Sequence, residues 1–207
     1  MKLYHSPGAC SLAVHIALRE AGQPFELHKV DLATHRLADG SDYHAINPRG
    51  YVPLLELDDA SRHTEVAALL QYVGELDRTH ALLPQAAPDT TLDRLAVVEW
   101  LGFVATELHK VFSPWLWHAE TADSTRQASC DKLALRFAEL DRHFAQRQWL
   151  ALNRFTVADA YAFTIVNWAN FLRLDLKPYP NLRAYLARVT ERPAVKAALI
   201  AEGLATS

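Results

Sequence analysis

The feature that most constrains this chain is the stretch at residues 79–91, because the hydrophobic pattern differs on its two sides. The stretch holds Pro84 and Pro88 with Gln-Ala-Ala between them. Such composition is typical of a loop between structural units. Before it, short apolar runs mix with helical periodicity, and after it only helical periodicity is found. We therefore expect an α/β domain at 1–78, a linker at 79–91 and an all-α domain at 92–207.

The first 78 residues indicate a strand–helix–strand beginning followed by two more strands and a helix. Helix-breaking residues end the first helix at Gly22-Gln23-Pro24. Thr64 is a suitable N-cap for the second helix, and Glu65 would complement its dipole. The expected strands are 2–4, 25–30, 52–57 and 62–64, and the expected helices are 11–21 and 64–77.

Beyond the linker, the spacing predicts helices only. One long helix should begin at about Leu92 and end before Pro114, because proline breaks the backbone ladder. Its expected apolar stripe consists of Leu95, Val98, Gly102, Ala105, His109 and Phe112. A capping pattern at Thr156 and Asp159 opens a later helix. The other expected helices are 125–146, 181–190 and 193–201.

Bulk properties exclude several classes of protein. The 207 residues are enough for a sizeable core, and the formal charge of −3 argues against a surface for nucleic acid or anionic membrane. Two distant cysteines and the lack of an apolar segment at the start favour a reducing, cytoplasmic location. The apolar stretches of the long helix are too short to span a membrane, and none of the ten histidines forms a helical pair for a metal. We expect no metal.

A cysteine lies where the first strand passes through a Ser-Pro-Gly turn into a helix. Ser11 is expected to act as the N-cap, its hydroxyl accepting an amide N–H of the first turn. Cys10 then lies at the positive end of the helix, where a thiolate is favoured. The alternative is that Cys10 is a small buried hydrophobe, as free cysteines often are.

Seven motifs in this order along the chain resemble those of the cytosolic glutathione S-transferases, most closely the bacterial beta class. They are Lys2-Leu3-Tyr4 with Pro7-Gly8-Ala9-Cys10-Ser11-Leu12, Asn47-Pro48-Arg49-Gly50 with Val52-Pro53, Thr64-Glu65, Glu107-Leu108-His109-Lys110, Phe155-Thr156-Val157-Ala158-Asp159-Ala160-Tyr161, Glu191-Arg192-Pro193 and Glu202-Gly203-Leu204. The resemblance implies a thioredoxin-like glutathione-binding domain, a helical domain that builds the electrophile site, and a homodimer.

The resemblance also assigns the residues that hold glutathione. Val52-Pro53 is the family's cis-proline position, which turns the Val52 backbone toward the tripeptide. Glu65 would receive the γ-glutamyl ammonium, and the Val66 N–H at the helix start would bind the adjacent carboxylate. His35 would contact the glycyl carboxylate. Glutathione is thus expected as co-substrate.

Three residues are predicted to act on the glutathione sulfur or to close the site beside it. Cys10 and Ser11 would stabilise the thiolate by hydrogen bonding, and His109 would line the site from the helical domain, with Thr106 close to the same face. Cys10 is alternatively able to form a mixed disulfide with the thiol. Three aromatic residues are candidates for the floor of the electrophile pocket, or else for the core: Phe112, Trp115 and Trp117.

Four positions depart from the family pattern. His5 replaces a common tyrosine and His35 replaces lysine, which makes the contact with the glycyl carboxylate weaker and dependent on pH. Val66 replaces glycine or serine, and Gly102 replaces asparagine. These changes weaken contacts with glutathione and predict either that glutathione binds weakly or that another thiol is preferred.

The sequence therefore predicts a glutathione transferase that conjugates the glutathione thiol to hydrophobic electrophiles, in detoxification. One alternative is glutathione-dependent reduction of disulfides or peroxides, with Cys10 as nucleophile. The other is a non-catalytic protein that binds apolar ligands on the same fold. The weakened contacts favour this last alternative.

Overall fold

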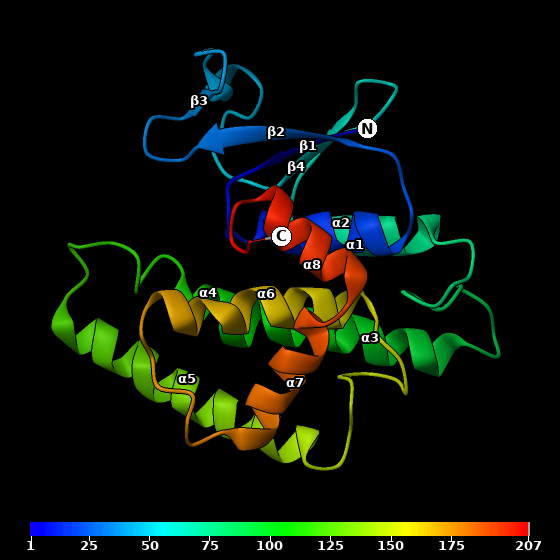
Figure 1. Ribbon diagram of the computed structural model, residues 1–207, viewed down its shortest axis with the longest axis vertical. Coiled ribbons are helices and arrows are strands. Elements are labelled where there is room, and N and C mark those ends of the chain that lie inside the picture. The colour runs from blue at the N-terminus through cyan, green and yellow to red at the C-terminus, as the bar shows by residue number, and fades with distance from the viewer. Residues whose placement is uncertain (207) are drawn as a thin grey trace.

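The computed structural model describes residues 1–206, which form a sheet domain and a helical domain (Figure 1). The sheet domain has two helices and a short 3₁₀ helix, η1 (Tyr43–Ala45). Its remaining elements in chain order are β1 (Lys2–His5), α1 (Ser11–Glu20), β2 (Glu26–Asp31), β3 (Arg36–Leu37), β4 (Leu54–Glu56), β5 (Arg62–His63) and α2 (Val66–Leu76).

The five-stranded sheet has the order β3-β2-β1-β4-β5. β1 pairs with β2 in parallel, so the chain must cross over between them, and α1 is that crossover. The other three pairings are antiparallel. Leu3 and Leu55 pair across β1 and β4, and neither is exposed to solvent. The central strand β1 thus leads directly from the core into the turn before Cys10.

The helical domain begins at Thr91 and contains six α-helices and one π-helix within the described residues. Helix α6 (Val157–Phe171) of this domain has twelve buried residues and lies against the sheet domain. The elements are α3 (Thr91–Phe103), the π-helix η2 (Val104–His109), α4 (Lys110–Phe112), α5 (Asp123–Phe144), α6 (Val157–Phe171), α7 (Pro180–Thr190) and α8 (Pro193–Ala201).

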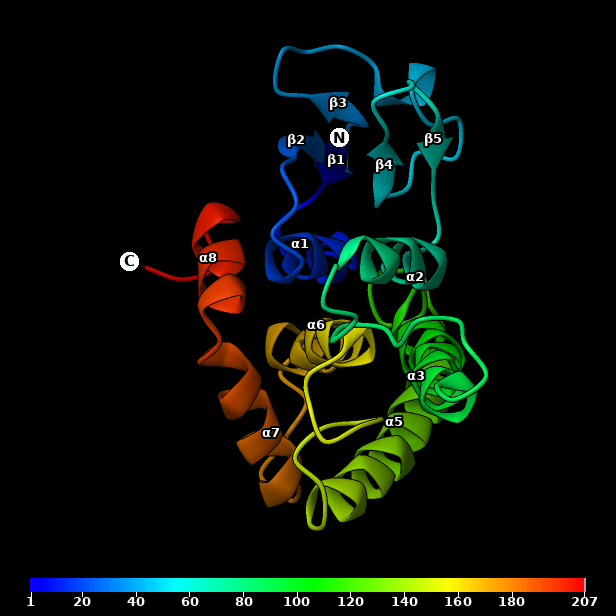
Figure 2. The ribbon, with the colours of Figure 1, turned by 90° about the vertical axis from the view of Figure 1, so that its right-hand side faces the viewer.

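The elements stack in layers, and the end of the chain returns to its beginning (Figure 2). The sheet lies on α1 and α2, and these two helices lie on α6. Helix α8 comes back beside α1. One hydrophobic cluster includes Leu12 and Ile16 of α1 as well as Phe163 of α6, so the two domains share a core. This contact fixes the position of each domain's site residues relative to the other.

The predicted fold class, an α/β sheet domain followed by an all-α domain, is confirmed. The helix at 193–201 has the predicted bounds, and the long helix ends at Phe112, before Pro114. The boundaries 1–78, 79–91 and 92–207 stay a prediction, with which the observed end of α2 and start of α3 are compatible.

The long helix differs from its prediction in register. It contains a π-helix, and its buried face consists of Val97, Leu101, Val104 and Leu108. The predicted stripe was wrong at two positions, because Leu95 is 58% exposed and Gly102 is exposed as well. The predicted stripe and the observed buried face are both largely apolar in sequence. Spacing alone therefore does not show which of these two adjacent helix faces packs on the core.

The predicted helix caps had different outcomes. The capping box at Thr156 and Asp159 is present and confirmed. Thr64 as N-cap is wrong, because α2 begins at Val66 and the N-cap position is taken by Glu65, whose φ is 70°. The strand at Arg36–Leu37 was not predicted, since two residues carry too little pattern.

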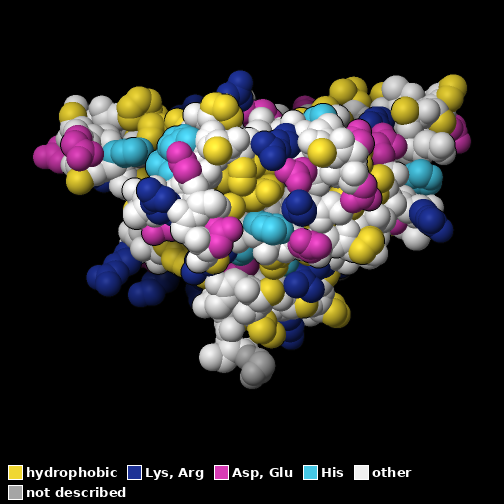
Figure 3. Space-filling view, turned by 90° about the horizontal axis from the view of Figure 1, so that it is seen from above, with side chains coloured by type: hydrophobic (Ala, Val, Ile, Leu, Met, Phe, Trp, Pro, Cys, Tyr) yellow, Lys and Arg dark blue, Asp and Glu magenta, His cyan; other side chains and the backbone are white. Residues whose placement is uncertain are grey.

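Seen from the side of the sheet domain, the surface mixes basic, acidic and hydrophobic side chains (Figure 3). Neither sign of charge forms a continuous field on this face, in keeping with the net charge of −3. Across residues 1–206, no helix is both long enough and apolar enough to cross a bilayer.

Candidate glutathione site

The turn before α1 brings Cys10 against the segment that precedes β4. The Cys10 Sγ–H donates a hydrogen bond to the Val52 carbonyl oxygen at 3.2 Å. The Val52–Pro53 peptide bond is cis. Cys10 is half-buried, while Val52 is 7% exposed. A sulfur atom and the backbone of a cis-proline segment, 42 residues apart in sequence, therefore lie in direct contact.

The charge state of Cys10 differs from the prediction. Burial raises the pKa of the Cys10 thiol to about 12, although the backbone N–H groups of Cys10 and Ser11 and the charge of Lys110 act in the opposite direction. The prediction that the helix dipole keeps Cys10 as a thiolate is thus wrong. Desolvation is the larger effect, and at neutral pH Cys10 is a neutral hydrogen-bond donor.

Ser11 is not the N-cap of α1, and this prediction was wrong. Cys10 occupies the N-cap position, and Ser11 is the first helical residue. The Ser11 Oγ–H donates to the Ser6 carbonyl at 3.3 Å and its oxygen accepts from the Ser6 N–H at 3.2 Å. The side chain is fully buried and closes the turn. Ser11 therefore acts on the Cys10 sulfur through its backbone N–H and not through its hydroxyl.

Glu65 and Val66 lie where the chain enters α2. Glu65 is exposed and adopts φ 70°, in the left-handed region that costs energy for a residue with a side chain. Its carboxylate makes no capping hydrogen bond and lies 3.3 Å from Arg49 Nη1. Val66 is 5% exposed at the first helical position. Because strained residues cluster at ligand sites, Glu65 is a candidate ligand-binding residue.

His35 lies in the loop beside the cis-proline segment. Its ring packs on that of His44, with 4.4 Å between ring centroids. A Cβ at Gly50, where φ is 69°, would lie 2.8 Å from an atom of each ring, so only glycine fits there. His35 Nδ1 is buried without a hydrogen-bond partner in the described structure. His44 was not predicted, because the sequence alone did not show which loop residue would meet position 35.

His109 is the last residue of the π-helix, a type of helical bulge that is frequent at functional sites. Its Nδ1 lies 2.6 Å from the hydroxyl of Tyr161. Burial, and secondarily the charge of Lys110, lowers the pKa of His109 to about 4, so the imidazole is neutral at pH 7. Thr106 is exposed and donates its hydroxyl to the Gly102 carbonyl at 3.0 Å. Thr106 thus has no contact with His109 through that hydroxyl.

The three candidate aromatic residues divide between core and surface. Phe112 is fully buried and packs on Phe137, so it belongs to the core and does not floor a pocket. Trp115 and Trp117 are 46% and 45% exposed. The Trp117 ring packs edge-on against Trp168 at 5.5 Å between centroids. The two half-exposed tryptophans remain available to a ligand.

Two residues that the sequence analysis did not assign hold the turn before Cys10. The Trp168 Nε1–H donates to the Gly8 carbonyl at 2.8 Å, and the Gly8 N–H donates to Glu202 Oε2 at 2.9 Å. Both partners come from the helical domain and its C-terminal segment. No local pattern predicts such contacts, since they join residues 160 and 194 positions apart.

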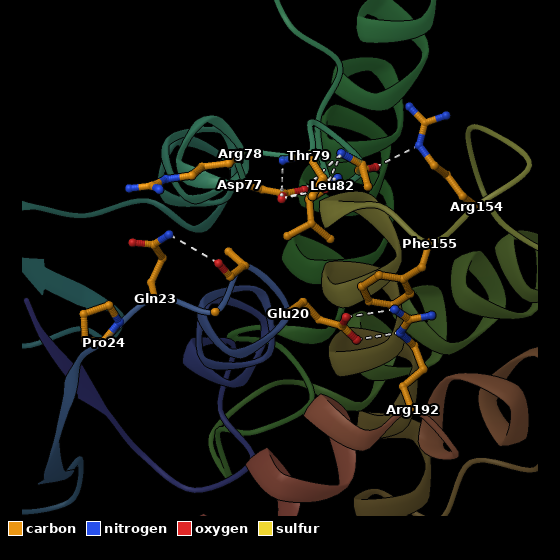
Figure 4. A pocket seen from close by; sticks show the side chains of 13 residues that line it. Glu20, Gln23, Pro24, Asp77, Arg78, Thr79, Leu82, Arg154, Phe155 and Arg192 are labelled. Atoms are coloured by element: carbon orange, nitrogen blue, oxygen red, sulfur yellow. Dashed lines mark hydrogen bonds and ion pairs between the residues drawn. The ribbon is translucent and has the colours of Figure 1, made fainter.

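A groove of about 680 Å³ lies at another junction of the two domains (Figure 4). The Arg192 guanidinium pairs there with Glu20, and Arg154 donates to the Ala81 carbonyl. Asp77 accepts backbone N–H groups of the following loop. None of the predicted glutathione-binding residues lines this groove. Several of its polar side chains are already paired with groups of the protein. Residues of both domains line the groove, and Cys10 is not among them.

Among residues 1–206, no group of three or more histidine, cysteine, aspartate or glutamate side chains is arranged to hold a metal ion. His15 and His5 approach the Glu202 carboxylate at 2.8 and 3.4 Å. Arg19 also donates to His15 Nε2, so this cluster is an internal hydrogen-bond network.

Comparison with known protein families agrees with the site. Residues 8–76 match the model of the glutathione S-transferase N-terminal domain, and residues 103–193 match that of its C-terminal domain. GstA of Escherichia coli O157:H7 is 42% identical over 204 residues, which cover 99% of this chain and all of the relative. Glutathione S-transferase GST-4.5 of Xanthomonas campestris pv. campestris is 38% identical over 210 residues, 99% of this chain and 100% of that protein.

Solved structures show the same fold over the whole chain. The sphingomonad glutathione S-transferase complexed with glutathione has a TM-score of 0.92 at 42% identity, covering 99% of this chain and 100% of that one. The beta-class enzyme of Sphingomonas chungbukensis has a TM-score of 0.93 at 41% identity, with the same coverage. The chain therefore belongs to the glutathione S-transferase family. Within it, the chain is similar to the bacterial beta class.

The activity follows from this membership. The chain is a transferase that conjugates glutathione, as the names of its full-length relatives indicate. The reductase and binding-protein alternatives are not favoured by these relatives.

Proposed function

We propose that glutathione lies along the Val52 backbone, with its sulfur beside Cys10 and its γ-glutamyl group at Glu65 and the Val66 N–H. The observation that carries this assignment is the 3.2 Å contact between Cys10 Sγ and the Val52 carbonyl. It joins the helix start that would stabilise a sulfur anion to the backbone that would hold a peptide. The backbone of Val52 and Pro53 would hold the tripeptide.

The strained backbone of Glu65 supports its assignment to the γ-glutamyl ammonium. The residue adopts φ 70°, and its exposed carboxylate makes no capping hydrogen bond to α2 and lies 3.3 Å from Arg49 Nη1. The first N–H groups of α2 are then free for the neighbouring carboxylate of the ligand. His35, with His44 against it, would meet the glycyl carboxylate. An imidazole, which lacks the permanent charge of a lysine, gives a weaker contact there.

Several donors would stabilise the glutathione thiolate. The backbone N–H groups of Cys10 and Ser11 act on the Cys10 sulfur and would also be near a glutathione sulfur placed beside it. The Cys10 S–H, which donates to the Val52 carbonyl in the structure, would turn from that carbonyl to donate to the bound sulfur. Because the pKa of Cys10 is about 12, its role is hydrogen bonding to the co-substrate sulfur and not attack on the electrophile. The Ser11 hydroxyl contributes by closing the turn. His109 approaches from the helical domain, with Thr106 at the outer edge of the same helix.

The electrophile would lie against the half-exposed indoles of Trp115 and Trp117. Trp168 packs on both Trp117 and His109, which connects this apolar surface to the sulfur site. Holding thiolate and electrophile together is worth several kcal/mol of the barrier in well-oriented reactions, on the order of 7–11 at best.

The resemblance further supports a homodimer that acts in the cytoplasm on small molecules, without nucleic acid or membrane partners. Leu92 and Leu95 of α3 and Tyr51 are exposed by 78%, 58% and 72%, which is apolar area that a second copy would cover. Conjugation in this setting is a detoxification reaction. No metal takes part in the proposed chemistry.

Calorimetric titration with glutathione, together with a conjugation assay on an activated aryl chloride, tests the proposal. We expect binding and turnover in the wild type. Glu65→Gln should weaken glutathione binding by about tenfold or more, because it removes the charge that faces the ammonium. Glu26→Gln, which removes an exposed carboxylate elsewhere in the same domain, should change neither. Absence of binding heat and of turnover in the wild type would contradict the proposal.

A further inference from the structure

The hydroxyl of Tyr161 and the imidazole of His109 form a short contact at the inner side of the candidate site. The distance from the hydroxyl oxygen to Nδ1 is 2.6 Å, and the two rings meet nearly at right angles, at 85°. Tyr161 belongs to α6 and is 2% exposed. No sequence pattern predicts a role for Tyr161, and its hydroxyl has no part in the glutathione contacts proposed above.

The direction of this hydrogen bond follows from what surrounds the hydroxyl. A buried O–H needs an acceptor, and His109 Nδ1 is the partner of the Tyr161 hydroxyl among residues 1–206. Burial also raises the pKa of Tyr161 above its usual value, so the phenol keeps its proton. The hydroxyl therefore donates, and His109 Nδ1 accepts.

This direction determines which ring nitrogen of His109 carries hydrogen. A neutral imidazole has one N–H and one lone pair, and in His109 the lone pair at Nδ1 is already occupied. The imidazole is neutral at pH 7 because burial lowers its pKa to about 4. The proton must then be at Nε2. A hydrogen bond at one nitrogen commonly sets the tautomer of the whole ring in this way.

The second ring nitrogen, Nε2, is left available to a ligand. Among residues 1–206 Nε2 has no hydrogen-bond partner and is not fully buried, so solvent reaches it. The ring packs on Trp168 at 5.2 Å, and Trp168 donates to Gly8 in the turn that leads to Cys10. Through Trp168, the His109 ring is thus linked to the turn that places Cys10.

We propose that Tyr161 is a positioning residue that holds His109 as the Nε2–H tautomer, so that His109 presents a hydrogen-bond donor to the sulfur of bound glutathione. This inference rests on the proposed function. It assigns His109 the role of stabilising the thiolate and excludes the role of general base, because neither nitrogen has a free lone pair. The proton of the glutathione thiol accordingly leaves to water, and the sulfur keeps its electron pair for the bond to the electrophile.

The tautomer can be measured directly in the intact protein. Long-range proton–nitrogen NMR spectra of protein with isotope-labelled histidine distinguish the two forms, and the His109→Gln variant identifies the signal. We expect a protonated Nε2 and an unprotonated Nδ1 at neutral pH. The Nδ1–H form in the wild type would overturn the proposal, whether or not any variant folds. This outcome is independent of glutathione binding, whose absence would instead contradict the proposed function.

Tyr161→Phe tests the consequence for the reaction. Without the hydroxyl, both tautomers of His109 should be populated. The thiol of bound glutathione should then ionise at higher pH, which the ultraviolet absorbance of the thiolate measures. We also expect kcat to fall about three- to tenfold with little change in KM. A loss of packing alone would not move the ionisation of the bound thiol. Tyr179→Phe is the matched control, since it removes a hydroxyl that bonds to the Ala134 carbonyl elsewhere in the helical domain. A Tyr161→Phe enzyme with unchanged thiol ionisation and tautomer would also overturn the proposal.

Discussion

The Glu202 carboxylate accepts a hydrogen bond from the Gly8 backbone N–H at 2.9 Å, across 194 positions of the sequence. Its other oxygen lies 2.8 Å from His15 Nδ1. Although burial alone would raise it, these donors hold the pKa of Glu202 below its usual value, so the buried group is a carboxylate. The last segment of the chain thereby fixes the turn that places Cys10.

Substitution of Glu202 by glutamine should loosen this turn. The amide has no charge and offers one acceptor where the carboxylate serves two donors, so we expect about 2–4 kcal/mol less free energy of unfolding. Urea denaturation measures the loss. Glu191→Gln, at an exposed ion pair with Lys196, should cost less than about 0.5 kcal/mol. Equal effects of the two substitutions would contradict the assigned role of Glu202.

Asp159 should be among the most important polar residues for stability. Its buried carboxylate accepts hydrogen bonds from the backbone N–H groups of Thr156 and Leu150 and from the hydroxyl of Tyr185. Asp159→Ala leaves these donors unsatisfied and should lower the free energy of unfolding by about 3 kcal/mol or more. Asp123→Ala, in the exposed first turn of α5, should cost less than about 1 kcal/mol in the same denaturation experiment. A small loss at Asp159 would show that the capping box is dispensable.

The low pKa of His109 predicts a contribution to acid sensitivity. The unfolded chain takes up this proton near the ordinary value of 6.5 and the native protein only near about 4. The stability that depends on neutral His109 is therefore complete above pH 6.5 and is lost as pH falls toward 4. Between about pH 7 and about pH 5, the wild type should lose about 2 kcal/mol more than His109→Gln. Urea denaturation at both pH values tests this, and identical losses in the two proteins would contradict it.

His35→Lys should strengthen glutathione binding at neutral pH. Lysine is charged there, whereas a histidine changes its charge between about pH 5 and pH 8. We expect KM for glutathione to fall about threefold at pH 7. A glutathione amide that lacks the glycyl carboxylate serves as the control and should show no improvement. Improvement with both compounds would place the contact elsewhere on the ligand.

Local chemistry allowed much of the fold to be predicted from sequence. Prolines and glycines marked the ends of helices, and the capping box at Thr156 and Asp159 identified the start of α6. The prediction of Thr64 as N-cap failed because the N-cap position of α2 is occupied by Glu65, whose backbone has the unusual φ of 70°. Ser11 failed because its hydroxyl finds the Ser6 backbone, which only the folded turn brings within reach.

The candidate site was predictable where motifs were continuous and unpredictable where distant segments meet. Cys10 and Val52 came from short motifs, and the structure brings them together. The thiolate prediction failed because burial, which depends on the whole fold, outweighs the helix dipole. The contacts of Tyr161 with His109 and of Glu202 with Gly8 join residues 52 and 194 positions apart, beyond any local pattern.

The most direct test of the central claim, that glutathione binds beside Cys10, is protection of this cysteine from alkylation. Iodoacetamide labelling at about pH 9, where thiols react more readily, is quantified for each cysteine by peptide mass spectrometry, with and without saturating S-methylglutathione. Cys130 on α5 is the internal control in the same molecule. We predict that the ligand slows labelling of Cys10 by about tenfold or more and leaves Cys130 unchanged. Unchanged labelling of Cys10 at a ligand concentration shown by calorimetry to saturate the protein would contradict the account.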